Sequence, residues 1–222
     1  TFSEEVQNFT IEDISAENAN LSDFVSTANP VFTVTVTPVA IGTVSVEVIE
    51  AVCQDLAGNN NTASNTYTIE YDNTQPTVTV TSPETSPTNN GLFDITITFS
   101  EEISGFAIGD ITVGNGIASD LATSDSIVFT AKIDPSADGT VTVDVNAGVA
   151  SDHAGNDNLA ATQLSLIYDG TNPTVTITTL EPDPTNNVTF SVIFTFDEEV
   201  SDFTIDDISV TNGGKANFQT TN

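Results

Sequence analysis

The chain has 222 residues, of which two are basic (Lys132 and Lys215) and 32 are acidic, giving a formal net charge of −30. Nothing in it could neutralise phosphates, which excludes nucleic acid as a partner and makes an anionic membrane surface unattractive. No stretch approaches the run of about 18 apolar residues that a membrane-spanning helix needs, so no membrane insertion is expected in this segment.

A period of 97 residues, free of insertions and deletions, places Phe2, Phe99 and Phe196 in one register. Such a period is typical of arrays of one small domain. It divides the chain into unit 1 (1–72, without its first strand), unit 2 (73–169, complete) and unit 3 (170–222, without its last strands). The only cysteine, Cys53, aligns with Ala150, which predicts a small buried residue and not half of a disulfide.

Apolar residues alternate with polar ones throughout unit 2, as in half-buried strands. In chain order, strands are expected around 77–81, 93–99, 106–113, 117–121, 127–133, 141–145 and 164–168. About seven short strands, with turn residues between them and no helix of useful length, predict an all-β fold. The expected architecture is a tandem of immunoglobulin-like antiparallel β-sandwiches.

Short linkers join the units, at 71–77 and 168–174. Pro76 and Pro173 occupy the same place in each linker. Proline fixes its own φ and holds the preceding residue extended, so both joints should be partly stiff without any ligand.

Three polar clusters recur with the period: an acidic pair after the second strand, a DxAGNxN motif before the last strand, and an aspartate in the linker. In an immunoglobulin-like sandwich these segments should meet at one pole, beside the junction of two units. The first junction would gather Asp72, Glu101, Glu102, Asp152 and Asn156. The second would gather Asp169, Glu198 and Glu199, and the corresponding residues of unit 1 are Glu4, Glu5 and Asp55.

Several carboxylates gathered without basic partners favour a hard divalent cation, and Ca²⁺ accepts six to eight oxygen ligands from flexible loops. Zinc, copper and iron would prefer His or Cys, and the only histidine, His153, aligns with Leu56. The alternative is that the acidic pairs are simply solvated and that DxAGN is turn chemistry. Asp13, Asp110 and Asp207, in FxxxDI segments, are predicted to cap backbone groups.

The segments TFSEEISGFAIGDITVGNG, DPSADGTVTVDVNAGVASDHAGN and DGTNPTVTI resemble the bacterial immunoglobulin-like repeats of large cell-surface proteins and adhesins. The resemblance implies an extracellular location and calcium at the junctions, held here by Asp72, Glu101, Glu102 and Asp152. PVAIGT in unit 1 replaces PSADGT in unit 2, so Ile41 stands where Asp138 would be, and Asp138 is not expected to be a ligand.

These features indicate a structural protein and not an enzyme, because no nucleophile–base pair recurs and the carboxylate pairs lie beside linkers in every unit. The leading hypothesis is a stalk of rigid units whose joints are stiffened by Ca²⁺, with neighbouring repeats of the chain as partners. The alternative is an extracellular filament whose subunits complete each other's sandwiches with an exchanged strand. Ligand binding by loop tips is less supported, since no aromatic cluster marks the loops.

Overall fold

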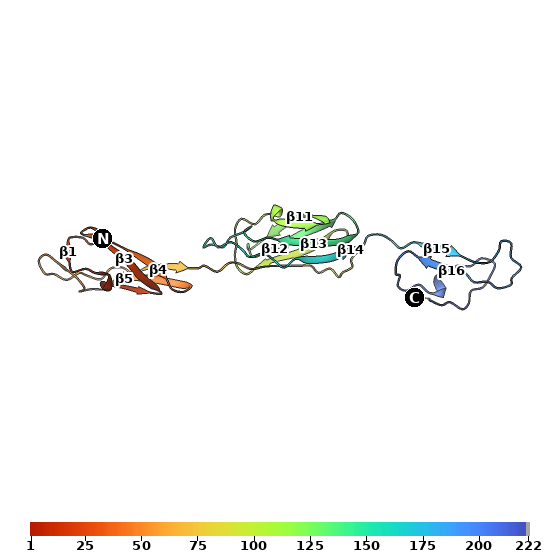
Figure 1. The fold of residues 1–222 in the computed structure, drawn as a ribbon, viewed down its shortest axis with the longest axis horizontal. Helices are drawn as coiled ribbons and strands as arrows, with labels where there is room; N and C mark the ends of the chain where they lie inside the picture. Colours follow the sequence, from red (N-terminus) through yellow and green to blue (C-terminus); the bar gives the residue numbers. More distant parts are fainter. Residues whose placement is uncertain (221–222) are drawn as a thin grey trace.

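In the computed structural model, which describes residues 1–220, three β-structured bodies follow one another in a row (Figure 1). The described residues also contain three single 3₁₀ turns, η1 (Ile11–Asp13), η2 (Ile108–Asp110) and η3 (Ile205–Asp207). Within these 220 residues, no helix has the length and apolar character needed to cross a membrane.

Unit 2 is a sandwich of two antiparallel sheets, and it has the seven strands that the sequence predicts. The four-stranded sheet has the order β11-β12-β9-β8, and the three-stranded sheet has the order β10-β13-β14. The strands are β8 (Val78–Thr81), β9 (Phe93–Phe99), β10 (Ile111–Gly114), β11 (Gly116–Thr123), β12 (Val128–Pro135), β13 (Gly139–Val145) and β14 (Leu164–Tyr168).

The alternating residues of unit 2 form its core, because successive side chains of a strand point to opposite faces of the sheet. On β9, Phe93, Ile95, Ile97 and Phe99 are all buried, while the residues between them face outward. Phe129, Ala131 and Ile133 of β12 extend this face within the same sheet, and Val141, Val143 and Val145 of β13 cover it from the opposite sheet.

Unit 1 repeats this arrangement in part, with sheets of order β2-β5-β7, β3-β4 and β1-β6. Its rings of Phe2, Phe9 and Phe32 meet edge to face, and Cys53 is buried, as the sequence predicts. The strands are β1 (Val6–Gln7), β2 (Ile14–Glu17), β3 (Ala19–Ala28), β4 (Val31–Pro38), β5 (Gly42–Val48), β6 (Gln54–Asp55) and β7 (Tyr67–Tyr71).

In residues 170–220, two strands pair with each other, β15 (Val175–Thr178) and β16 (Ile193–Phe196). Val175 and Ile177 of β15 remain exposed there, whereas their counterparts in unit 2, Val78 and Val80, are buried. The inward face of β15 therefore lacks the second sheet that covers the same face in unit 2.

One expected strand is wrong in part, because the segment predicted around 106–113 begins with η2 and is extended only from Ile111. Asp110 causes this turn by accepting a hydrogen bond from the backbone N–H of Ala107 at 2.8 Å. Asp13 and Asp207 accept in the same way from Thr10 and Thr204, each at 2.8 Å, so the capping role predicted for these three aspartates is confirmed.

Candidate metal centre at the first junction

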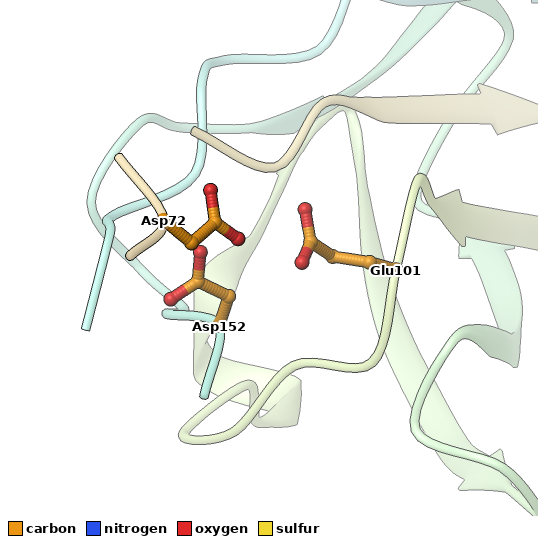
Figure 2. A group of neighbouring side chains, drawn as sticks. All are labelled: Asp72, Glu101 and Asp152. Carbon is orange, nitrogen blue, oxygen red and sulfur yellow. The ribbon is translucent and has the colours of Figure 1, made fainter. Parts of the chain in front are cut away.

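Three carboxylates from separate stretches of the chain meet beside the linker that joins unit 1 to unit 2 (Figure 2). Asp72 lies in that linker, Glu101 follows β9, and Asp152 lies in the loop between β13 and β14. Each offers one oxygen atom, and these atoms all lie within 4.8 Å of one another. The convergence expected from the sequence is therefore present for these three residues.

Asp152 is the most deeply placed of the three, with 5 % of its surface exposed. The backbone N–H of Asn156 donates to its Oδ1 and the Asn156 side-chain Nδ2 donates to its Oδ2, both at 2.8 Å. Burial by itself raises the pKa of Asp152, but hydrogen bonds from Asn156, Gly155 and Ala154 outweigh burial, and the pKa lies below its ordinary value. The loop thus holds an ionised carboxylate in a fixed orientation.

The first linker is fastened to unit 2 by the same DxAGNxN loop. The amide Nδ2 of Asn156 also donates to the backbone carbonyl of Asp72 at 3.1 Å. Gln75 Nε2 donates to the carbonyl of Asp157 at 3.0 Å, and the N–H of Leu159 donates to the carbonyl of Pro76 at 2.8 Å. Asn156 therefore acts as a donor that positions Asp72 and Asp152.

Glu101 experiences the repulsion that this clustering creates. Burial, the charge of Asp152 and the charge of Asp72 raise its pKa, in that order of importance. Both basic residues pair elsewhere, Lys132 with Asp94 at 3.1 Å and Lys215 with Asp206 at 4.0 Å. The three carboxylates therefore meet without a positively charged side chain to offset them.

We expect the metal-free protein to become more stable as the pH falls from 7 toward the ordinary glutamate pKa of 4.5. Glu101, whose pKa is raised in the fold, takes up its proton there before the unfolded chain does. Below the ordinary aspartate pKa of 3.8, the sign reverses for Asp152, whose stabilising contribution is lost as the pH falls through its lowered folded value.

This pH dependence can be measured by urea denaturation between pH 3 and pH 7 for the parent and the Glu101→Gln variant. The variant should gain less stability than the parent between pH 7 and pH 4.5, because only the contribution of Glu101 is removed, and it should keep the decline at lower pH. Coincident curves for the two proteins above pH 4.5 would contradict the assignment to Glu101.

Glu102 is not one of the three carboxylates that meet here, although the sequence predicts that both members of the acidic pair lie at the junction. It is exposed, whereas Glu101 lies beside Asp72 and Asp152. Successive side chains of a strand point to opposite faces, and Glu101 follows the end of β9 by two residues, in register with the inward residues of that strand. Phe99 and Ile103, at the same parity as Glu101, are buried, and this parity is the signal that identifies the inward member.

In unit 1, Asp55 has the same hydrogen bonds as Asp152 but lacks the neighbouring carboxylates. It accepts from the N–H groups of Ala57 and Asn59 and from the Asn59 side chain, each at 2.8 Å. Glu4 and Asp55 line one cavity of about 550 Å³, and Glu5 is exposed. Among the residues that the structure describes, these three carboxylates form no close set comparable to that of Asp72, Glu101 and Asp152.

At the second junction, Glu198 lies near Asp169, as the sequence predicts, and both Glu198 and Glu199 are exposed. Burial raises the pKa of Glu198, followed by the charges of Asp169, Asp197 and Asp138. Asp197 and Asp138 also lie close to this junction, although the sequence does not predict a role for them there. Asp138 reaches this junction because the next residue, Gly139, pairs with Tyr168. This pairing sets the hairpin between β12 and β13 against the start of the linker.

The sequence profile that describes the bacterial Ig-like domain matches residues 1–71, 72–168 and 169–222. A solved structure of FdeC, an adhesin of Escherichia coli, is 14 % identical in sequence, with a TM-score of 0.36. The similarity covers 82 % of this chain and 60 % of the adhesin chain. No match was found among curated proteins. Since the profile matches the chain from end to end in three successive copies, the protein belongs to the bacterial Ig-like domain family.

Proposed function

We propose that this chain is a structural segment of an extracellular bacterial surface protein or adhesin, in which Ca²⁺ stiffens the joints between repeats. The observation that carries the proposal is the meeting of Asp72, Glu101 and Asp152, since it joins the linker to two loops of unit 2. Stalks of this kind need no catalytic site, and the repeat is proposed to be non-enzymatic.

The donor set suits a hard cation. All three side chains offer carboxylate oxygen, and oxygens bound at 2.3–2.6 Å to one Ca²⁺ lie no more than about 5 Å apart. The separations of up to 4.8 Å fall inside that range. Backbone carbonyls and water would complete the six to eight ligands, while Mg²⁺ would require a tighter and more regular octahedron.

A cation at this place would act on the joint and not only on one unit. Without it, three negative groups repel one another. The Asp72 carboxylate then accepts from the backbone N–H of Thr74, and Asn156 binds only the backbone carbonyl of Asp72. With it, Asp72 is bound to Glu101 and Asp152 of unit 2. The array of Figure 1 would then hold its extended form, with short linkers and a net charge of −30 that discourages collapse.

The test is thermal unfolding and small-angle scattering of the full chain in calcium and in chelator. We expect calcium at a hundred times its dissociation constant to stabilise unit 2 by about 2.7 kcal/mol through mass action. The Glu101→Gln variant should lose most of this response. Glu102→Gln is the matched control, since it removes one negative charge from an exposed side chain that directly follows Glu101. This variant should keep the calcium response.

Identical melting temperatures and dimensions of the parent protein in calcium and in chelator would reject the calcium-stiffened joint. An equal loss of response in Glu101→Gln and Glu102→Gln would instead indicate general screening of the acidic surface, which also rejects the specific site.

A second candidate is a filament subunit completed by a strand from another copy. The cavity of about 550 Å³ in unit 1 favours it, because the rings of Phe2, Phe9, Phe24 and Phe32 line that cavity and a strand would cover them. Light scattering over a range of protein concentrations tests this candidate. A strictly monomeric chain at millimolar concentration would reject it.

A further inference from the structure

The linker that follows unit 2 is held to that unit by an acidic side chain from the hairpin between β12 and β13. Asp138, between β12 and β13, accepts a hydrogen bond from the backbone N–H of Gly170 at 2.7 Å through Oδ1. Its Oδ2 accepts from the hydroxyl of Thr171. These bonds hold the pKa of Asp138 below its ordinary value, so the carboxylate stays ionised at neutral pH.

A second loop holds the residues just before this point. Ser86 Oγ accepts from the N–H of Ile167, and the N–H of Thr88 donates to the carbonyl of Ile167, both at 2.9 Å. The N–H of Asp169 donates to the carbonyl of Thr88, also at 2.9 Å. The exit segment is therefore bound continuously from Ile167 to Thr171 by two loops of unit 2.

The absence of a side chain at Gly170 is part of the same arrangement. A Cβ there would lie 2.8 Å from Cζ of Tyr168 and closer still to its hydroxyl, which real contacts do not tolerate. The Tyr168 ring thus packs directly over the linker backbone. Asn73 occupies the equivalent place in the first linker and could not accept a tyrosine ring in this position.

The first linker lacks the acidic fastening although the hairpin beside it has the same register. Gly42 pairs with Tyr71 just as Gly139 pairs with Tyr168, which sets residue 41 where residue 138 lies. Ile41 offers no acceptor, and 56 % of its surface is exposed. The bonds of this linker run instead to the unit that follows, through Asn156 and Gln75.

We propose that Asp138 is a latch that fixes the exit linker to unit 2 without any cation, so that the two joints of this chain are of different kinds. Where the preceding unit has an aspartate at this hairpin position, the linker keeps a fixed orientation relative to that unit in the absence of calcium. A joint that follows an isoleucine depends on the carboxylate cluster downstream. The consequence for stalk stiffness rests on the proposed function, whereas the latch itself does not.

The experiment is measurement of backbone order parameters of the full chain by ¹⁵N relaxation, in excess chelator. In the parent, Gly170 and Thr171 should be as ordered as the strands of unit 2, with values near 0.85, and Asp138→Ile should lower them to below about 0.6. Isoleucine is the residue that unit 1 carries at this place, so the variant should fold. Thr171→Val, which removes the hydroxyl donor and keeps the Gly170 bond, should give a smaller decrease.

Asp120→Asn is the control, because it removes a charge from unit 2 at a position with φ of 54°, which asparagine also adopts, and away from the linker. It should leave Gly170 and Thr171 unchanged. Unchanged order parameters in Asp138→Ile would overturn the latch, and so would an equal decrease in Asp120→Asn. Because the measurement is made without calcium, its result is independent of whether calcium stiffens the first joint.

Discussion

Replacing Phe99 with alanine should lower the free energy of unfolding of unit 2 by about 3–5 kcal/mol. The Phe99 side chain is 1 % exposed, and its ring meets those of Phe106 and Phe129 edge to face, with centroids 5.2 Å and 5.9 Å away. The substitution removes a large apolar volume and also leaves a cavity that the two sheets cannot close. A domain of this size is stable by only about 5–15 kcal/mol, so the loss is a large fraction of the total.

Phe2→Ala is the matched control in unit 1, because the period places Phe2 at the same position of the repeat. Phe2 also meets two rings, Phe9 at 4.9 Å and Phe32 at 5.9 Å, but it is only half-buried and borders an open cavity. We expect a smaller cost, about 1–2 kcal/mol, since less apolar area leaves water. Hydrogen exchange read by mass spectrometry separates the units, and equal losses in the two variants would contradict the difference in burial.

The fold could be predicted from the sequence because its determinants are local and repeated. Alternation along β9 and β13 identifies the inward residues of both sheets, and the repeat supplies three independent readings of the same pattern. The turn at η2 was missed because a short apolar segment fits a strand equally well. Asp110, which was identified as a cap, was the residue that marked the turn.

The candidate site was predictable in outline for a topological reason. Loops that follow alternate strands of a sandwich lie at one pole, so Asp72, Glu101 and Asp152 could be brought together from their places in the unit. The directions of the side chains were harder to predict from the sequence. The exclusion of Glu102 required strand parity, and the donor role of Asn156 depends on which way an amide turns, which spacing does not determine.

The largest gap concerns the last asparagine of the DxAGNxN motif. The sequence predicts one polar loop from the whole DxAGNxN motif, whose last residue is Asn61 in unit 1 and Asn158 in unit 2. The structure divides it into two roles. The aspartate faces the junction, whereas Asn158 is completely buried and points into the unit.

Replacing Asn158 with alanine should therefore destabilise unit 2 by about 3 kcal/mol or more without changing the carboxylate cluster. Its Oδ1 accepts from the N–H groups of Val149 and Ala150 at 3.0 Å and 2.9 Å. Its Nδ2 donates to the carbonyls of Asn146 and Leu159 at 2.9 Å and 2.7 Å. Alanine would leave all four backbone groups without this partner. The carbonyls of Asn146 and Leu159 belong to exposed residues and can turn to water, whereas the N–H groups of Val149 and Ala150 lie deeper, and each buried group left unpaired costs about 1–3 kcal/mol.

Asn158→Asp separates the two halves of this network. It keeps an acceptor for Val149 and Ala150 but loses both donors and places a carboxylate against two carbonyl oxygens, so it should destabilise unit 2 at least as strongly as alanine at neutral pH. Asp157→Ala, at an exposed neighbouring side chain, should cost less than about 0.5 kcal/mol. Chemical denaturation, with hydrogen exchange as the probe of unit 2, gives the change in the free energy of unfolding for all three variants. If Asn158→Ala costs no more than Asp157→Ala, the buried network does not stabilise the loop.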